Sequence, residues 1–284
     1  MADESESEAA PVVATPKEPG EKRLALWERA ADAIIAVPVA FLSEIGFLAR
    51  LLFESLLWAV RPPYRFRVLI DAMEFVGVQS IFLVSLTAIF VGAVFSLQLV
   101  DSLRQFGAES QVGTIVSLAL VRELGPVFAA LMISSRAGSA IATELGSMRV
   151  SNQIDALTTM SVSPVQYLVA PRLLAGFLMV PAMALLFEAV GLYGAHFVAV
   201  DLFGLDGGIF LDNARWYVDG MDVIQSITKA AVFGVAVTLI ACRQGFYASG
   251  GAAGVGQATN RAVVQSAVAV LVLDYFVTAL FIGS

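Results

Sequence analysis

The chain has 284 residues, of which 58% are hydrophobic and 14% are charged, with a mean hydropathy of +0.81 and a formal net charge of −7. Soluble domains are less apolar and more charged, so this composition excludes an ordinary soluble enzyme and predicts an all-α integral membrane protein. The length suits one membrane domain of several helices and leaves too little chain for an added catalytic domain of normal size.

The N-terminal residues 1–21 differ from the rest of the chain. They hold six of the 24 acidic residues and are rich in Ala, Glu and Pro, with little apolar surface to bury. We predict a disordered acidic tail. It lacks the basic start and apolar core of a cleaved signal peptide, so the first hydrophobic elements are expected to be retained.

Residues 22–67 are apolar but carry charges too often for a membrane span. At 100° per residue, Arg50, Glu54 and Arg61 share an arc of about 40°, and apolar residues occupy the rest of the helix surface. This pattern predicts amphipathic helices in the membrane interface, broken near Pro38 and followed by a basic connector. The alternative is a sixth span, which would invert the charge asymmetry across the membrane.

A domain of five membrane-spanning helices is predicted for residues 68–284, because five apolar segments approach or exceed the ~20 residues that cross a bilayer as a helix. Pro181 and Glu188 interrupt the third segment, Lys229 lies close to the mouth of the fourth, and Asp274 lies inside the fifth. The expected spans cover residues 75–100, about 110–135, about 173–200, about 223–241 and about 261–282.

The basic residues predict the orientation of these spans. Eight of the 17 Lys and Arg residues precede the first span, whereas the connection between the third and fourth spans carries five Asp residues. Lys and Arg are retained on the cytoplasmic side of short loops. We therefore expect a multi-pass membrane protein with its N-terminus on the cytoplasmic side and its C-terminus on the opposite side.

A charge pair, Arg122 and Glu123, lies midway along the second span, with twelve uncharged residues on each side. A charge in hydrocarbon costs at least ~2.5–3.5 kcal/mol, so such residues usually face a protein interior or a water-filled path and serve a function. The alternative is that Gly125 and Pro126 break the segment, which would leave the pair near an interface where long side chains reach water.

The cytoplasmic stretch between the second and third spans is mixed in polarity and predicts a short helix at about 144–161. This helix is expected to dock a cytoplasmic subunit; the alternative is a solvated connector on the membrane surface. Its candidate docking residues, apolar on one side and polar on the other, are Glu144, Leu145, Met148, Arg149, Gln153, Ile154, Asp155 and Leu157.

Catalytic and metal-binding chemistry is poorly supported. The glycine-rich segment 245–256 lacks the lysine of a phosphate-binding GxxxxGK[ST] loop. Cys242 is the single cysteine, which excludes an internal disulfide and a cysteine metal cluster. His196 is the single histidine and is expected to pack or cap rather than bind a metal. Glu188 and Asp274 could form a proton relay, although structural pairing between helices is the favoured interpretation.

Two segments carry a resemblance to a known family. Residues 121–172, VRELGPVFAALMISSRAGSAIATELGSMRVSNQIDALTTMSVSPVQYLVAPR, and residues 256–280, GQATNRAVVQSAVAVLVLDYFVTAL, resemble the MlaE/YrbE permeases of ABC transporters, which work with MCE-domain proteins in lipid transport. The resemblance covers about residues 65–284. It implies the function of a phospholipid permease subunit that moves lipid between the inner membrane and MCE proteins on the periplasmic side.

The same resemblance implies a set of partners. These are a second copy of the chain, two cytoplasmic ABC ATPases that use ATP and Mg, a ring of MCE-domain proteins and often a STAS-domain protein. No cofactor is expected in this chain, and nucleic acid is not among the implied partners. The helix at about 144–161 is implied to be the coupling helix on the ATPase.

The resemblance further implies a lipid cavity between the two subunits. It places around the lipid Phe95, Leu103, Phe106, Arg122, Glu123 and Leu124. Arg122 suits a phosphate, because a guanidinium stays charged and can bond a phosphate through two donors. Glu123 points about 100° away from Arg122 on a helix, so we expect it to contact the other subunit, a head-group amine or a neighbouring helix.

Two other classes of function remain open from the residues alone. An ion-coupled transporter acting alone would be expected to show inverted repeats and discontinuous helices in both halves, and neither is evident. A membrane scaffold that only recruits partners would have no need for buried charges at Arg122 and Glu123.

Overall fold

A computed structural model describes residues 43, 44, 46–58 and 66–282 of the chain. The chain divides into two compact units, residues 1–47 and 48–284, and the second contains all the elements treated below. The predicted acidic tail, the helix break at Pro38 and the third polar-stripe residue, Arg61, lie outside the described residues.

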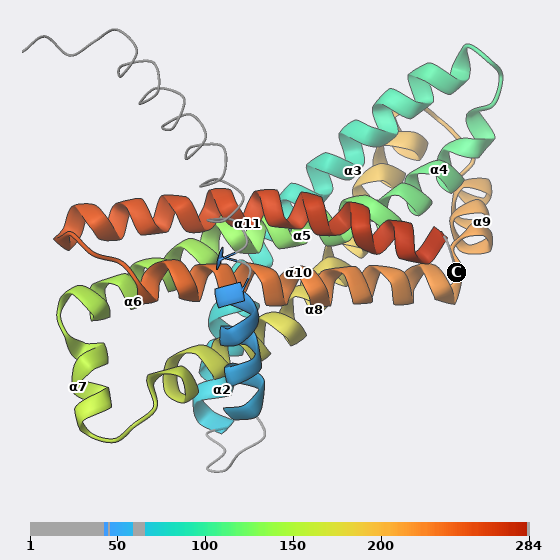
Figure 1. The fold of residues 1–284 in the computed structure, drawn as a ribbon. Coiled ribbons are helices and arrows are strands. Elements are labelled where there is room, and N and C mark those ends of the chain that lie inside the picture. The colour runs from blue at the N-terminus through green and yellow to red at the C-terminus, as the bar shows by residue number, and fades with distance from the viewer. Residues whose placement is uncertain (1–42, 45, 59–65, 283–284) are drawn as a thin grey trace, which may run out of the picture. The chain divides into compact units, whose positions relative to one another are not determined.

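Every regular element in the described part of the chain is helical, and five helices are long and apolar enough to cross a membrane (Figure 1). This confirms the predicted all-α fold with five candidate spans. Numbered as spans one to five, these helices are Phe66–Arg104, Glu109–Val150, Val165–Leu202, Gly220–Phe246 and Gly251–Phe281.

A shorter helix precedes the spans and continues through residues 48–58. Arg50 and Glu54 form an ion pair of 2.8 Å on its exposed side, as their spacing along the predicted polar stripe indicates. Phe53 and Leu56 are exposed, whereas Leu51 is buried. The helix therefore offers apolar side chains both to the protein and to its surroundings.

Span one begins earlier than predicted. It combines α2 (Phe66–Val76), the short 3-10 turn η1 (Val78–Ser80) and α3 (Ile81–Arg104). The span was predicted to start just after Glu74, because charged residues are disfavoured in hydrocarbon. A charge does not end a helix, however, and this helix extends beyond the apolar segment.

Span two is one long helix rather than two pieces. Three α-helical segments alternate with two π-helical turns, and Pro126 lies in the first turn of the middle segment, where proline is tolerated. The predicted alternative of a break at Gly125 and Pro126 is therefore wrong. The segments are α4 (Val112–Ala119), η3 (Leu120–Leu124), α5 (Gly125–Ile133), η4 (Ser134–Gly138) and α6 (Ser139–Val150).

Span three packs against spans one and four through glycines. In α8 (Ala170–His196), Gly191 meets Gly92 of α3 so closely that a Cβ on Gly92 would collide with the Gly191 backbone. Gly176 and Gly234 approach in the same way where α8 crosses α10. Small residues permit such close helix crossings in membranes.

Pro181 does not interrupt span three, contrary to the prediction, because α8 continues through it. A proline removes one backbone hydrogen bond, and a helix packed on several sides tolerates that loss. Two π-helical turns, η5 (Val165–Val169) and η6 (Phe197–Leu202), flank α8.

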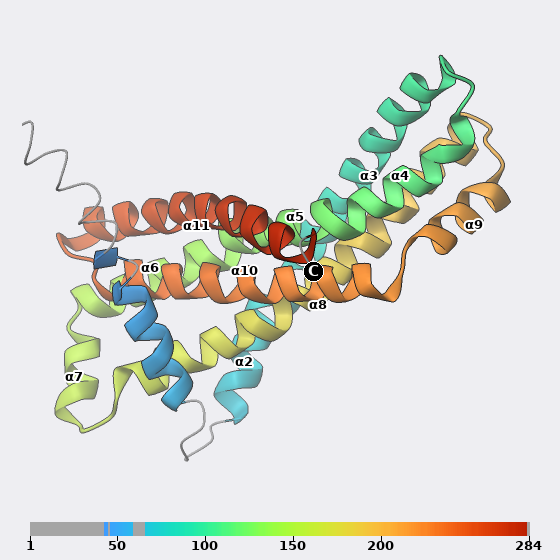
Figure 2. The ribbon, with the colours of Figure 1, turned by 45° about the vertical axis from the view of Figure 1, so that its right-hand side comes forward.

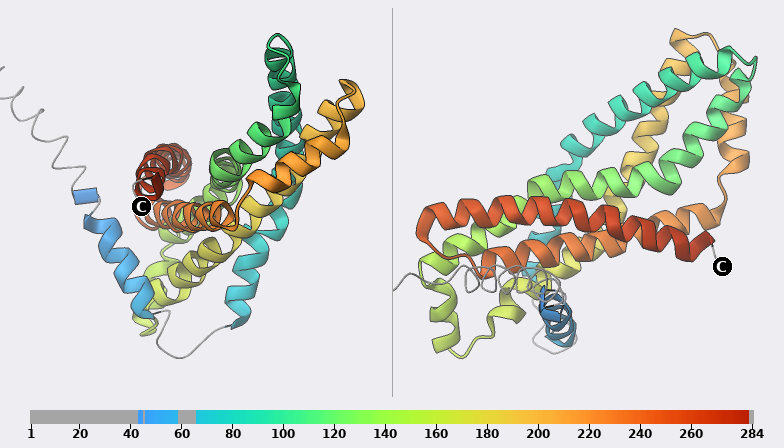
Figure 3. Two further views of the ribbon diagram at one scale, coloured as in Figure 1. Left: turned by 90° about the vertical axis from the view of Figure 1, so that its right-hand side faces the viewer. Right: turned by 45° about the horizontal axis from the view of Figure 1, so that its top comes forward.

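Spans four and five are α10 (Gly220–Phe246) and α11 (Gly251–Ile282), which run side by side (Figure 3). The glycine-rich segment provides only a short turn between them, where Gly250 and Gly251 take left-handed φ values of 91° and 68°. Span five therefore begins about ten residues before its predicted start, because the apolar run used to place it begins only after Arg261.

The connection between spans three and four contains a helix that was not predicted, α9 (Gly207–Tyr217). Asp206 starts it by accepting a 3.0 Å hydrogen bond from the Ile209 N–H. Phe210 and Ala214 are its buried residues, and α9 packs against α4. The η2 turn (Glu109–Gln111) that starts span two also lies beside α9.

The predicted single helix at about 144–161 is two helices. α6 ends at Val150, Asn152 takes a left-handed conformation with φ 59°, and α7 (Gln153–Thr159) follows. Asparagine tolerates this conformation better than most residues, which makes a turn possible without glycine or proline. Figure 2 shows α7 at the end of the helices opposite to α9 and the turn between α3 and α4.

Candidate functional site

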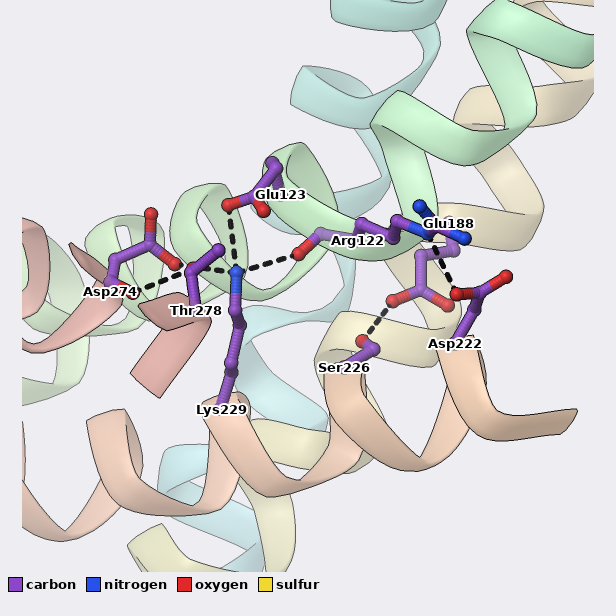
Figure 4. Close-up of polar contacts among 8 residues, drawn as sticks. All are labelled: Arg122, Glu123, Glu188, Asp222, Ser226, Lys229, Asp274 and Thr278. Atoms are coloured by element: carbon purple, nitrogen blue, oxygen red, sulfur yellow. Dashed lines mark hydrogen bonds and ion pairs between the residues drawn. The ribbon is translucent and has the colours of Figure 1, made fainter. Parts of the chain in front are cut away.

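A buried lysine, Lys229 of α10, connects three spans near the middle of the described domain (Figure 4). Its Nζ donates to Glu123 Oε2 at 2.7 Å and to the Arg122 carbonyl at 2.9 Å. Asp274 Oδ1 of α11 lies 2.9 Å away as an ion pair without hydrogen-bond geometry. The sequence places Lys229 close to the mouth of span four, and the structure shows that its side chain is fully buried among the helices.

The bond from Lys229 to the Arg122 carbonyl follows from the sequence of span two. In an α-helix this carbonyl would accept from the N–H four residues later, but that residue is Pro126, which has no N–H. The helix widens into the π turn η3 at this point, and Lys229 supplies the missing donor. Such π turns are frequent at functional sites.

Arg122 pairs with a second residue of α10. Its Nε donates to Asp222 Oδ1 at 2.7 Å, and the Asp222 side chain is almost completely buried whereas that of Arg122 is 48% exposed. Asp222 also belongs to the capping box that begins α10, because its Oδ2 accepts from the Asp219 N–H at 3.1 Å. In the sequence, Asp222 is one of five Asp residues in the predicted connection between spans three and four, and nothing in its local pattern indicates this pairing.

Two further carboxylates were weighed as relay residues. Glu188 of α8 is buried and accepts a hydrogen bond from Ser226 of α10. Asp274 pairs with Lys229 of span four. Both observations agree with structural pairing between helices, and Glu123 likewise contacts a neighbouring helix, one of its three predicted partners.

The charges of this cluster are not equally used. Lys229 is shared by two carboxylates and is inaccessible, whereas the Arg122 side chain bonds only Asp222 among the described residues, through Nε, which leaves its terminal nitrogens without a described partner. Glu123 has a side chain that is 43% exposed. Arg122 is therefore the cation of the cluster that can bind an anionic group from outside.

Phe95 and Leu103 lie on α3, which forms a hairpin with α4 (Figure 1), and Leu124 lies in η3 beside Arg122. Phe106 lies in the turn of this hairpin and is 81% exposed, and Leu103 lies beside that turn. Phe95 and Arg122 are similarly distant from the turn along the two antiparallel helices, so they lie at a similar depth. The structure thus places the apolar and charged candidates on spans one and two and in the turn between them, without bringing all of them into contact.

The candidate docking residues divide by burial. Leu145 and Ile154 are buried within the chain, so their side chains hold α6 and α7 in place. Two ion pairs stabilise the same region: Arg149 Nη1 lies 2.6 Å from Asp155 Oδ1, and Glu144 Oε2 lies 2.7 Å from Arg172. The residues that remain accessible to a partner are Glu144, Gln153, Asp155 and, in part, Met148, Arg149 and Leu157.

The remaining special residues have structural roles. His196 packs edge-on against Phe210 with ring centroids 5.4 Å apart, in agreement with the prediction that it packs. Cys242 is buried and free. Among the described residues no group of three His, Cys, Asp or Glu side chains could hold a metal ion.

Five membrane-length helices, with an ion cluster that joins spans two, four and five, define a multi-pass membrane protein. The family model "Permease MlaE" matches residues 69–280, so the chain belongs to the MlaE permease family.

Relatives agree with this family. A "Probable ABC transporter permease protein" of Rickettsia felis is 38% identical over 88% of this chain and 97% of its own length. The "Intermembrane phospholipid transport system permease protein MlaE" of Haemophilus influenzae is 36% identical over 87% of this chain and 95% of its own. "Protein TRIGALACTOSYLDIACYLGLYCEROL 1, chloroplastic" of Arabidopsis thaliana is 34% identical over 75% of this chain and 61% of its own. In ABC transporters, ATP hydrolysis lies in a partner of the permease.

Proposed function

We propose that this chain is the permease subunit of an ABC-type transporter that moves phospholipid between the inner membrane and MCE-domain proteins on the periplasmic side. The name of the Haemophilus influenzae relative supports this substrate. The observation within the chain that carries the proposal is Arg122, a half-exposed guanidinium at membrane depth whose terminal nitrogens bind no described residue.

The chemistry of a phospholipid fits this arrangement. A phospholipid carries an anionic phosphate beside two apolar tails, so its site must combine a cationic donor with an apolar surface. Arg122 supplies the donor, and the exposed and half-exposed residues of the α3–α4 hairpin supply the surface. The proposed lipid contacts are Phe95, Leu103, Phe106, Arg122, Glu123 and Leu124.

The energy for transport comes from a cytoplasmic ABC ATPase, which holds the ATP and Mg. We infer that it docks on the accessible residues of α6 and α7, which places the N-terminus in the cytoplasm and the C-terminus in the periplasm. Closure of two ATPases would move α7 in each copy of a homodimer, compress the lipid site and transfer lipid to or from the MCE ring. A STAS-domain protein completes the proposed assembly.

Purification of the tagged chain with its membrane partners tests this function. The expected result is copurification of an ATPase and retention of bound phospholipid. A chain that purifies alone and transports an ion would support the ion-coupled transporter instead. A chain that recruits partners but holds no lipid, and whose ATPase does not respond to lipid, would support the scaffold.

A further inference from the structure

We infer that Asp222 is the positioning residue for phosphate recognition by Arg122. This inference rests on the proposed function of the site as a phospholipid binder. The observation behind it is that the buried Asp222 carboxylate binds Nε of the half-exposed Arg122 side chain, whereas the two terminal nitrogens of Arg122 have no described partner.

The geometry of the Arg122 guanidinium supports this role. Its five N–H donors form a planar fork, and Asp222 takes the Nε donor at 2.7 Å. In Figure 4 the dashed bond runs from Nε of Arg122 to Asp222 of α10, and the two terminal nitrogens of the guanidinium take no part in it. These nitrogens are the pair that bonds a phosphate through two donors.

Asp222 is itself held in one orientation. Its second oxygen accepts from the backbone N–H of Asp219, within the capping box at the start of α10. Its side chain is only 7% exposed, so water does not compete strongly for the bond to Arg122. The N-terminus of a 27-residue helix thus fixes a carboxylate, and the carboxylate fixes the arginine.

This arrangement lowers the cost of binding. A free arginine side chain loses rotamer freedom when it binds a ligand, and a side chain already held in its bound orientation loses less. Asp222 therefore increases lipid affinity, although it carries the same sign of charge as the phosphate. If Asp222 instead competed with the phosphate for Arg122, its removal would increase affinity.

The test is a double-mutant cycle in the complete transporter with its ATPase, held in mixed micelles of a nonionic detergent and phospholipid. The variants are Arg122→Ala, Asp222→Ala and the pair, and the readout is ATPase rate against the mole fraction of phospholipid in a nonionic detergent background. Asp222→Ala is expected to raise the half-saturating phospholipid roughly tenfold with little change in the maximal rate. The double variant should match Arg122→Ala alone, because Asp222 acts through Arg122.

Asp222→Asn and a second helix-capping residue provide controls. Asparagine keeps an oxygen acceptor for Nε, so Asp222→Asn should recover part of the affinity that Asp222→Ala loses. Asp206→Ala removes an aspartate that caps α9 and has no bond to Arg122, so the half-saturating phospholipid should not change. A general effect of losing a helix cap would appear in both alanine variants.

The outcomes separate this inference from the proposed function. If Arg122→Ala weakens the response to lipid but Asp222→Ala leaves it unchanged, strengthens it or adds independently to Arg122→Ala, only the positioning role is overturned. If Arg122→Ala itself has no effect, the phosphate site fails and the positioning role fails with it. If Asp222→Ala does not assemble, Asp222→Asn decides by whether its effect disappears in the Arg122→Ala background.

Discussion

Two arginines of span two, Arg122 and Arg136, lie in π-helical turns of the same helix and are used in opposite ways. Arg136 Nη1 donates to the Phe75 carbonyl at 2.7 Å and to Ser80 at 3.1 Å, and its Nη2 donates to Gln79 at 2.5 Å. Its guanidinium also lies 5.4 Å from the Phe75 ring centroid. Arg122 has one bond, from Nε, and open terminal nitrogens.

The difference separates a structural arginine from the one that we propose binds the ligand. Arg136 donates hydrogen bonds to the Phe75 carbonyl near the end of α2 and to Gln79 in the turn that leads into α3. Its terminal nitrogens are therefore already bonded within the protein. Arg122 is held only at its inner edge. The charge of an arginine in a span therefore does not reveal its role, whereas the number of donors left open does.

The largest expected effect concerns the lysine that supports the Arg122 turn. Lys229→Met would leave Glu123 and Asp274 without their cation and the Arg122 carbonyl without its donor. Breaking a buried pair in this way should reduce the free energy of unfolding by about 3–5 kcal/mol, measured by titration with a denaturing detergent. Adding Glu123→Gln and Asp274→Asn should recover part of the loss, and a triple variant no more stable than Lys229→Met would contradict this account.

Arg136→Met should destabilise the fold by about 2–3 kcal/mol, because it leaves the Phe75 carbonyl and Ser80 without their donor. Thermal unfolding of the purified permease measures this effect. Arg136→Lys should fall between the wild type and Arg136→Met, since lysine keeps the charge but not the planar fork. Wild-type stability in Arg136→Met would show that the junction between α2 and α3 does not depend on this side chain.

Glycines near the two turns offer a matched comparison of packing. A Cβ at Gly125 would lie 2.6 Å from Glu188 Cγ and 2.7 Å from the Leu120 carbonyl, whereas a Cβ at Gly138 would meet its nearest atom at 3.5 Å. Gly125→Ala should therefore reduce stability by about 1–3 kcal/mol in the same unfolding assay. Gly138→Ala should be neutral or slightly stabilising, and equal effects at both positions would refute this packing argument.

The smallest stability effect is expected for a third arginine, Arg149, whose pair with Asp155 is partly exposed. Arg149→Ala should change the free energy of unfolding by less than about 0.5 kcal/mol, because solvent screens such pairs. It should nevertheless reduce binding of the partner ATPase, measured by copurification. Normal ATPase binding would remove Arg149 from the proposed docking surface, and Arg50→Ala, which breaks an exposed ion pair on another helix, serves as the control.

The fold was largely predictable, because five apolar segments determine five spans whatever their packing. Helix ends were less predictable. The charges of α2 and the glycines of α11 suggested boundaries, yet both segments are helical. Asn152 ends a helix by adopting a left-handed backbone, a conformation that asparagine permits but does not require.

Half of the ion cluster was not predictable from local patterns. Arg122 and Glu123 were evident as charges within an apolar segment, but their partners Asp222 and Lys229 come from a span about a hundred residues later. One signal was present in the sequence. Pro126 leaves the Arg122 carbonyl without its usual α-helical donor, and Lys229 is a charge inside another apolar segment.

The most direct test of the central claim compares the phospholipid content of the purified transporter complex between the wild type and Arg122→Ala. Only samples that are assembled and folded, as judged by thermal unfolding, are compared. The account predicts that bound phospholipid falls at least about fivefold, because Arg122 supplies the open donors of the site, while the fold remains intact. Unchanged bound phospholipid in a folded, assembled Arg122→Ala complex would contradict it.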